Sequence, residues 1–90
     1  MHGSLLPHYR GRAPVNWAVL HGEHETGATL HAMVQQADAG PIVAQEAVPI
    51  LPDDTAIEVF RKVTVAAECT LHACLPALLA GTAPHVPQDP

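Results

Sequence analysis

The stretch that decides the fold runs from Gly27 to Ile50 and reads GATLHAMVQQADAGPIVAQEAVPI. Within it, residues 27–34 alternate between the two sides of an extended chain, which predicts a half-buried strand. Residues 42–50 form a second extended run, which ends at prolines. The loop between them, 35–41, has turn residues near its end. Because consecutive strands joined by a short link usually pair antiparallel, the stretch predicts a β-hairpin.

A long helix is predicted directly after the hairpin, over residues 55–79. Thr55 and Glu58 have the spacing of a capping box, in which each side chain satisfies a free backbone N–H. Apolar side chains recur every three or four residues and predict the face that packs on the core. This stripe comprises Ile57, Phe60, Ala67, Leu71, Leu75 and Leu78 and is interrupted by Thr64. Pro76 is expected to kink or interrupt the helix because it lacks an N–H, and Gly81 is a suitable stop.

The flanking segments complete an α/β pattern. Residues 1–12 read as a strand end that runs into a loop, and residues 13–20 as a short helix with a proline in its first turn. Residues 82–90 contain three prolines and are expected to be a tail or linker. The order strand end, short helix, hairpin and long helix predicts an α/β unit over residues 1–81.

Charge and hydropathy limit the classes of partner. The 90 residues carry four Lys and Arg against nine Asp and Glu, a formal net charge of −5. Nucleic-acid binding requires cations that neutralise phosphates, so we expect no nucleic-acid partner. No apolar run reaches the roughly 18 residues of a membrane span, and no secretory signal pattern opens the chain. We therefore expect no membrane partner.

The cysteines and histidines favour a reduced protein without a metal. Cys69 and Cys74 would lie on different faces of the long helix, too far splayed for a disulfide. This favours a cytoplasmic protein. His21, His24 and His31 lack the accompanying cysteines or carboxylates of a metal site, so we predict none. His31, on a strand, is expected to be structural, with a ligand role as the less favoured alternative.

Three strings carry the chemistry. They are HGSLLP at 2–7, YRGRAP at 9–14, and GATLH at 27–31 followed by DAG at 38–40. In this order and spacing they resemble the formyltransferase family that uses 10-formyltetrahydrofolate, whose members read N-x-H-x-S-L-L-P, G-x-T-x-H and D-x-G. The resemblance extends from His2 to about Gly81. It implies a fragment of a Rossmann-like formyltransferase domain, the second half of the catalytic unit.

The resemblance implies a catalytic trio of Asn, His and Asp. The His matches His2 and the Asp matches Asp38, whereas the Asn would lie two residues before His2. In formyl transfer an amine attacks the formyl carbon, and the oxyanion that develops needs hydrogen-bond donors aimed at it. Histidine titrates near neutral pH and suits the proton relay, and a carboxylate can orient or charge its imidazole.

Further site residues are expected from the same resemblance. The folate side comprises Ala37, Asp38 and Gly40, and the acceptor side comprises Ser4, Arg10 and Arg12. The folate loop would contact the pterin mostly through backbone groups, and an arginine would pair with an acceptor phosphate. The R-G-R-A-P string followed by Asn16-Trp17 most resembles the enzymes that formylate UDP-4-amino-4-deoxy-L-arabinose in lipid A modification. We therefore expect a UDP-amino sugar as acceptor, with the isolated chain a truncated, inactive portion.

Two other interpretations stay open. A methionyl-tRNA formyltransferase fragment would need a basic RNA-binding extension, which this chain does not contain. A non-catalytic remnant is the other, because the family Asn is missing. A hairpin packed on one helix is a marginal unit with a bare sheet edge and a partly buried apolar stripe. We therefore expect a weakly cooperative monomer or self-association.

Overall fold

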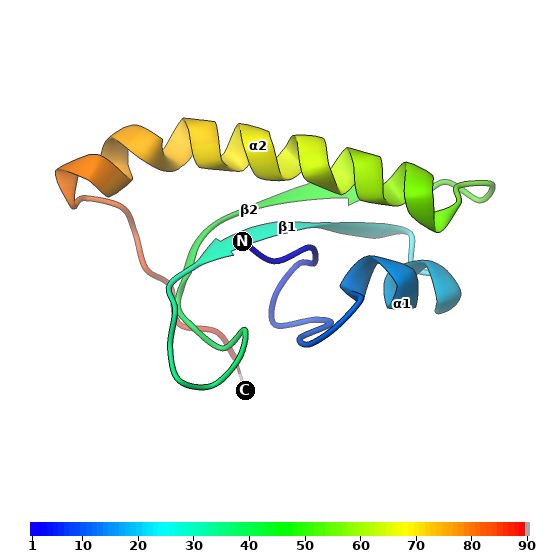
Figure 1. Cartoon of the computed structure of the whole chain (residues 1–90), viewed down its shortest axis with the longest axis horizontal. Helices are drawn as coiled ribbons and strands as arrows, with labels where there is room; N and C mark the ends of the chain where they lie inside the picture. Colours follow the sequence, from blue (N-terminus) through cyan, green and yellow to red (C-terminus); the bar gives the residue numbers. More distant parts are fainter. Residues whose placement is uncertain (90) are drawn as a thin grey trace.

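The computed structural model describes residues 1–89, which form two helices and a two-stranded sheet. In chain order the elements are α1 (Pro14–Leu20), β1 (Glu25–His31), β2 (Ile42–Pro49) and α2 (Ala56–Ala80). Figure 1 shows α2 running along the hairpin, with the N-terminal loop on the side of the strands away from it. The predicted α/β arrangement of short helix, hairpin and long helix is confirmed.

The hairpin has the predicted antiparallel pairing. Its register runs from Glu25 opposite Pro49 to Leu30 opposite Ala44, with an irregularity between Leu30 and His31. The N-terminal segment adds a bridge on the other edge of β1. Here His2 N donates to Thr29 O at 2.8 Å, and Thr29 N donates to His2 O at 2.9 Å. This bridge fixes His2 in the sheet, as expected for a strand end.

β1 is more buried than its alternating pattern predicts. Residues 26–29 are all buried, so the prediction of a half-buried strand is wrong for this stretch. Ala28 belongs to the hydrophobic core under α2. The Thr29 hydroxyl donates to Ser4 O and accepts from Leu6 N, so the N-terminal loop covers the other face. Threonine fits this second environment because its hydroxyl satisfies the loop backbone.

α2 packs through a different face from the predicted one. Its buried residues are Val59, Val63, Ala66 and Thr70, and they join Val15 and Ala28 in or next to the core. The predicted stripe is mostly exposed, with Ile57 at 65% and Phe60 at 60%. Two apolar rows lie about 100° apart on this helix, and both satisfy the helical period. The row of smaller side chains, Val59, Val63, Ala66 and Thr70, faces the strands. The predicted stripe, which includes the exposed Ile57, Phe60, Leu71 and Leu75, forms a second surface, called the flank below.

α2 begins and ends where predicted, but only the Thr55 half of the expected capping box forms, because the Glu58 carboxylate accepts from the Thr55 hydroxyl. Thr55 is the N-cap, and its hydroxyl accepts from Glu58 N at 3.3 Å. Gly81 ends the helix in a left-handed conformation with φ of 72°. Pro76 lies inside α2, which continues to Ala80, so the helix is not interrupted there, and the kink stays a prediction. Pro76 is exposed, so water can satisfy the carbonyl that loses its helical partner.

α2 is long and apolar enough, by length and composition, to cross a membrane, with a mean hydropathy of 1.5 in its most apolar window. A helix that covers the core of a soluble domain passes the same test. Here one face of α2 is packed on the hairpin through Val59 and Val63. Only 17% of the window is buried in this way, so most of the apolar length of α2 faces outward.

The segment after α2 returns toward the hairpin loop. Figure 1 shows it descending from the end of α2 past the strands. Val86 and Ile42 form an isolated antiparallel bridge, with N···O distances of 2.7 and 2.8 Å. Residues 82–89 therefore contact the hairpin, although a tail or linker was expected there.

Candidate active site

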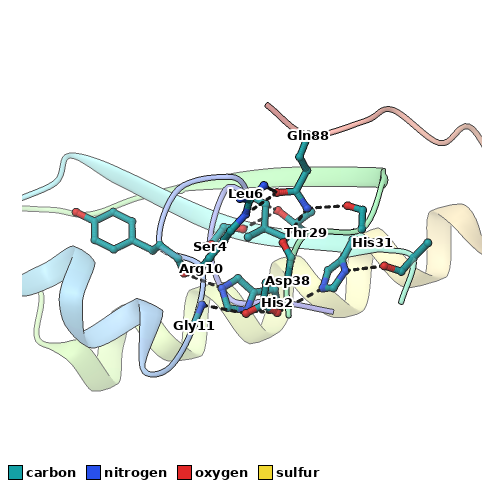
Figure 2. A network of polar contacts seen from close by, with 12 residues as sticks. His2, Ser4, Leu6, Arg10, Gly11, Thr29, His31, Asp38 and Gln88 are labelled. Atoms are coloured by element: carbon teal, nitrogen blue, oxygen red, sulfur yellow. Dashed lines mark hydrogen bonds and ion pairs between the residues drawn. The ribbon is translucent and has the colours of Figure 1, made fainter. Parts of the chain in front are cut away.

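Three side chains from separate segments converge at one end of the hairpin. His2 is placed by its bridge to β1, His31 ends β1, and Asp38 lies in the loop between the strands. Figure 2 shows the Asp38 carboxylate facing both imidazole rings. The two residues predicted to be catalytic, His2 and Asp38, are thus brought together.

The Asp38 carboxylate has a defined partner on each oxygen. Oδ2 accepts a hydrogen bond from Gly11 N at 2.9 Å. Oδ1 lies 3.4 Å from His2 Nδ1 and 3.8 Å from His31 Nε2. The His2 and His31 side chains are 9% and 6% exposed, and that of Asp38 is 21% exposed. A carboxylate in such a sheltered place interacts more strongly with an imidazolium than it would in open water.

The other ring nitrogen of each histidine is already occupied. His2 Nε2 lies 2.8 Å from Tyr9 O, and His31 Nδ1 lies 3.0 Å from Ala32 O. A carbonyl oxygen can only accept, so these nitrogens carry the proton. His2 Nδ1 and His31 Nε2 therefore face Asp38 with a lone pair when neutral and with an N–H when protonated. The nitrogen of His2 that is available for proton exchange is Nδ1.

The hairpin loop is built closely around Asp38. Asp38 has a left-handed backbone with φ of 55°, which Asp tolerates better than most residues. A Cβ at Gly40 would lie 1.7 Å from Ala32 O, so only glycine fits there. Ala32 N donates to Pro41 O at 2.9 Å and closes the base of the loop. Backbone geometry therefore requires the glycine at position 40 and is compatible with the aspartate at position 38.

A buried polar network supports the segment that carries His2. Ser4 is fully buried, and its hydroxyl donates to His8 O at 2.6 Å. Gln45 from β2 donates to Leu6 O at 2.7 Å and to the Thr29 hydroxyl at 2.9 Å. These bonds fix the backbone of the loop after His2, so the imidazole is held by a rigid support.

The remaining predicted residues are distributed around this centre. Arg12 and Ala37 are exposed. The Arg10 guanidinium bonds Gln88 and Asp89 O. Ser4 serves the loop, as described above. Their predicted contacts with folate or acceptor stay predictions.

His31 and Gly11 contribute to the site although they were not proposed as site residues. His31 ends the G-x-T-x-H string, where the strand period alone made it look structural. The role of Gly11 is carried by its backbone N–H, which has no signature in the side-chain sequence. Gln88 also contacts the Asp38 loop, and it is 50 residues away along the chain.

A hollow of about 310 Å³ opens beside His2. Its walls include Gly3 and Gly11 from the N-terminal loop and Phe60 and Val63 from α2. Most of the lining is apolar and His2 is one of the lining residues, so the hollow can hold an organic group beside His2. Among residues 1–89, no three His, Cys, Asp or Glu side chains are placed to hold a metal ion.

Two side chains outside the His2–Asp38 pair have shifted pKa values. Partial burial, together with a hydrogen bond to the Glu23 carboxylate and its charge, raises the pKa of Tyr9. The Lys62 ammonium, which hydrogen-bonds Asp54, and the Leu51 N–H lower the pKa of the Asp54 carboxyl. The Tyr9 hydroxyl thus stays a donor near the YRGRAP loop, and Asp54 stays an anion at the start of α2.

A paired histidine and aspartate on an α/β scaffold can serve in acid–base chemistry, as the sequence predicts for His2 and Asp38. Comparison with known proteins gives the class. The family model for formyl transferase matches residues 1–75. This chain belongs to the formyl transferase family.

Solved structures agree in fold. An N-formyltransferase from Helicobacter canadensis, in complex with folinic acid and dTDP-3-aminofucose, is 28% identical with a TM-score of 0.95, over 98% of this chain and 33% of that chain. A formyltransferase from Anoxybacillus kamchatkensis, with UDP-4,6-dideoxy-4-formamido-L-AltNAc and tetrahydrofolate, is 27% identical with a TM-score of 0.90, over 98% and 46%. A phosphoribosylglycinamide formyltransferase from Bacillus halodurans is 36% identical with a TM-score of 0.82, over 87% and 40%. This chain spans less than half the length of each of the three.

Proposed function

We propose that this chain is the part of a formyltransferase that carries its His and Asp, and that the enzyme transfers a formyl group from 10-formyltetrahydrofolate to the amine of a nucleotide-linked amino sugar. The observation that carries the proposal is the approach of His2 Nδ1 to Asp38 Oδ1, 3.4 Å, beside an apolar hollow. Two solved relatives that hold a folate together with a nucleotide sugar support the donor and the class of acceptor.

The chemistry needs a proton to be held and returned. The folate supplies an activated formyl group; the acceptor amine attacks it, loses a proton, and the folate nitrogen leaves with one. His2 Nδ1 and Asp38 Oδ1 can hold that proton between them, because Tyr9 O already occupies Nε2. The protonated His2 also stabilises the negative charge of the tetrahedral intermediate. His31 adds a second imidazole on the same carboxylate oxygen.

The finer acceptor we propose is UDP-4-amino-4-deoxy-L-arabinose, with the product used in lipid A modification and the enzyme located in the cytoplasm. The R-G-R-A-P string with Asn16 and Trp17 supports this choice. Glycinamide ribonucleotide is a second candidate acceptor, because the phosphoribosylglycinamide enzyme is the most identical of the three structures described above, at 36%. The net charge of −5 argues against a tRNA acceptor.

A chimera tests the proposal. The N-terminal half of a solved sugar formyltransferase is joined to residues 1–90 and assayed with 10-formyltetrahydrofolate and each candidate acceptor. We expect turnover with the UDP-amino sugar. If only glycinamide ribonucleotide is formylated, it becomes the acceptor in place of the UDP-amino sugar. As a control, the relative is rebuilt from its own two halves. If this control is active and the chimera is inactive with every acceptor, the proposed activity is contradicted.

A further inference from the structure

The segment that follows α2 reaches the candidate site. It lies outside the residues 1–75 that the family model matches. The bridge between Val86 and Ile42 sets it beside the base of the hairpin loop. Two residues further on, the Gln88 side chain reaches that loop, and Figure 2 shows Gln88 in the same network of contacts as Asp38 and Arg10.

Every polar atom of the Gln88 side chain is used. Its Nε2 donates to Asp38 O at 2.8 Å and to Gly40 O at 2.6 Å. Its Oε1 accepts from Arg10 Nε at 3.2 Å and from Arg10 Nη2 at 2.9 Å. Arg10 Nη2 also donates to Asp89 O at 3.1 Å. One amide thereby connects the hairpin loop, the YRGRAP loop and the C-terminal segment.

The chemistry of this position requires a primary amide. Only such a group offers two N–H donors for the two loop carbonyls and an oxygen acceptor for a guanidinium at the same time. The carbonyls belong to Asp38, whose backbone is left-handed, and to Gly40, which is packed against Ala32 O. Holding both carbonyls fixes the peptide planes on either side of the turn. The direction of the Asp38 carboxylate depends on those planes.

We propose that Gln88 is a positioning residue for the site: it clamps the Asp38 loop so that the carboxylate stays aligned with His2 and with Gly11 N–H. Arg10 orients the amide from its other side, so its guanidinium serves this clamp. The functional meaning of the clamp rests on the proposed function, because it preorganises the loop expected to contact the folate. Preorganisation lowers the cost of ordering that binding would otherwise carry.

The test compares Gln88→Ala and Gln88→Glu with Gln35→Ala in the full 90-residue chain. Glutamate keeps the shape of the side chain and the bonds from Arg10, but it cannot donate to the two loop carbonyls. It therefore separates the effect of the bonds to the carbonyls from that of the bonds to Arg10. Gln35 is an exposed residue of the same loop with no side-chain hydrogen bond within residues 1–89, and it serves as the matched control. Amide hydrogen exchange at Gly11 and binding of folinic acid are measured by NMR.

We expect both Gln88 variants to speed exchange at Gly11, whose N–H is held by Asp38 Oδ2, by about tenfold, the scale of one or two lost hydrogen bonds. We expect them to weaken folinic acid binding by a similar factor, with Gln35→Ala unchanged in both. Wild-type exchange at Gly11 in Gln88→Ala, or normal exchange in Gln88→Glu alone, would overturn the clamp. Faster exchange with unchanged folinic acid affinity would overturn its role in the site.

The two proposals can fail separately. If the wild-type chain does not bind folinic acid, folate use by this chain loses its support, and the exchange rates alone decide the clamp. Should Gln88→Ala unfold, Arg10→Ala replaces it. That variant removes the bonds to Oε1 while leaving both amide donors in place. It is expected to speed exchange at Gly11 by a smaller factor, and no change there would overturn the proposed orienting role of Arg10.

Discussion

The choice between the two apolar rows of α2 gives a quantitative prediction. Val59 is 0% exposed in the core, whereas its neighbour Phe60 is 60% exposed on the flank. Val59→Ala removes two buried methyl groups, worth about 0.8 kcal/mol each, and leaves a small cavity. The better helix propensity of alanine returns up to about 0.7 kcal/mol. We therefore expect Val59→Ala to lower the free energy of unfolding by about 1–2 kcal/mol.

Phe60→Ala is the matched comparison. Its ring is mostly in solvent, and the same gain in helix propensity applies, so the net loss should stay below about 0.5 kcal/mol. Urea unfolding followed by circular dichroism measures both, at concentrations where sedimentation shows a monomer. With a slope near 1 kcal/mol/M, the Val59→Ala midpoint should fall by about 1 M or more. A larger loss for Phe60→Ala than for Val59→Ala would refute the assignment of the buried face.

Four further outcomes are expected. The 90-residue chain alone should show no detectable formyl transfer with UDP-4-amino-4-deoxy-L-arabinose; turnover comparable to an intact relative would contradict this. In the chimera, His2→Ala and Asp38→Ala should each lower kcat at least about a hundredfold, while His72→Ala, on the exposed side of α2, should change little; a normal rate for Asp38→Ala would remove its assigned role. Because the pKa of Asp54 is lowered in the folded state, its contribution to stability is complete above the unfolded pKa near 4 and is lost as the pH falls through the folded pKa. Asp54→Asn should weaken the pH dependence of the free energy of unfolding over that range. An unchanged pH dependence would argue against the Lys62 contact. Finally, sedimentation should show self-association, or urea unfolding of the monomer should show a broad transition. A monomer by sedimentation with a sharp unfolding transition would show that the exposed flank is tolerated.

Local chemistry made much of the fold predictable. The capping box placed the start of α2 at Thr55, and Gly81 placed its end. The alternation around the D-A-G loop predicted the hairpin. The face of α2 was not predictable from period alone, because both of its apolar rows satisfy it. Which row is buried depends on how closely the helix approaches the strands, and that is a property of the tertiary packing.

The site divides in the same way. His2 and Asp38 were predicted from the resemblance of their motifs to the formyltransferase family, and the structure brings them together. His31 needed the hairpin register, including its irregularity next to Leu30, to show that its ring faces Asp38. Gln88 acts across a large sequence separation through main-chain carbonyls, which no motif of side chains records. Contacts of this kind emerge only when the chain is folded.

Phe60 has a double position that connects assembly with chemistry. It belongs to the exposed flank of α2, and it also forms a wall of the hollow beside His2. Any surface that covers the flank therefore also changes the size and water content of the space next to the imidazole. A change in assembly would then also change the surroundings of His2. For such a protein, the polarity sensed by a reporter at residue 60 should change over the concentration range in which the chains assemble.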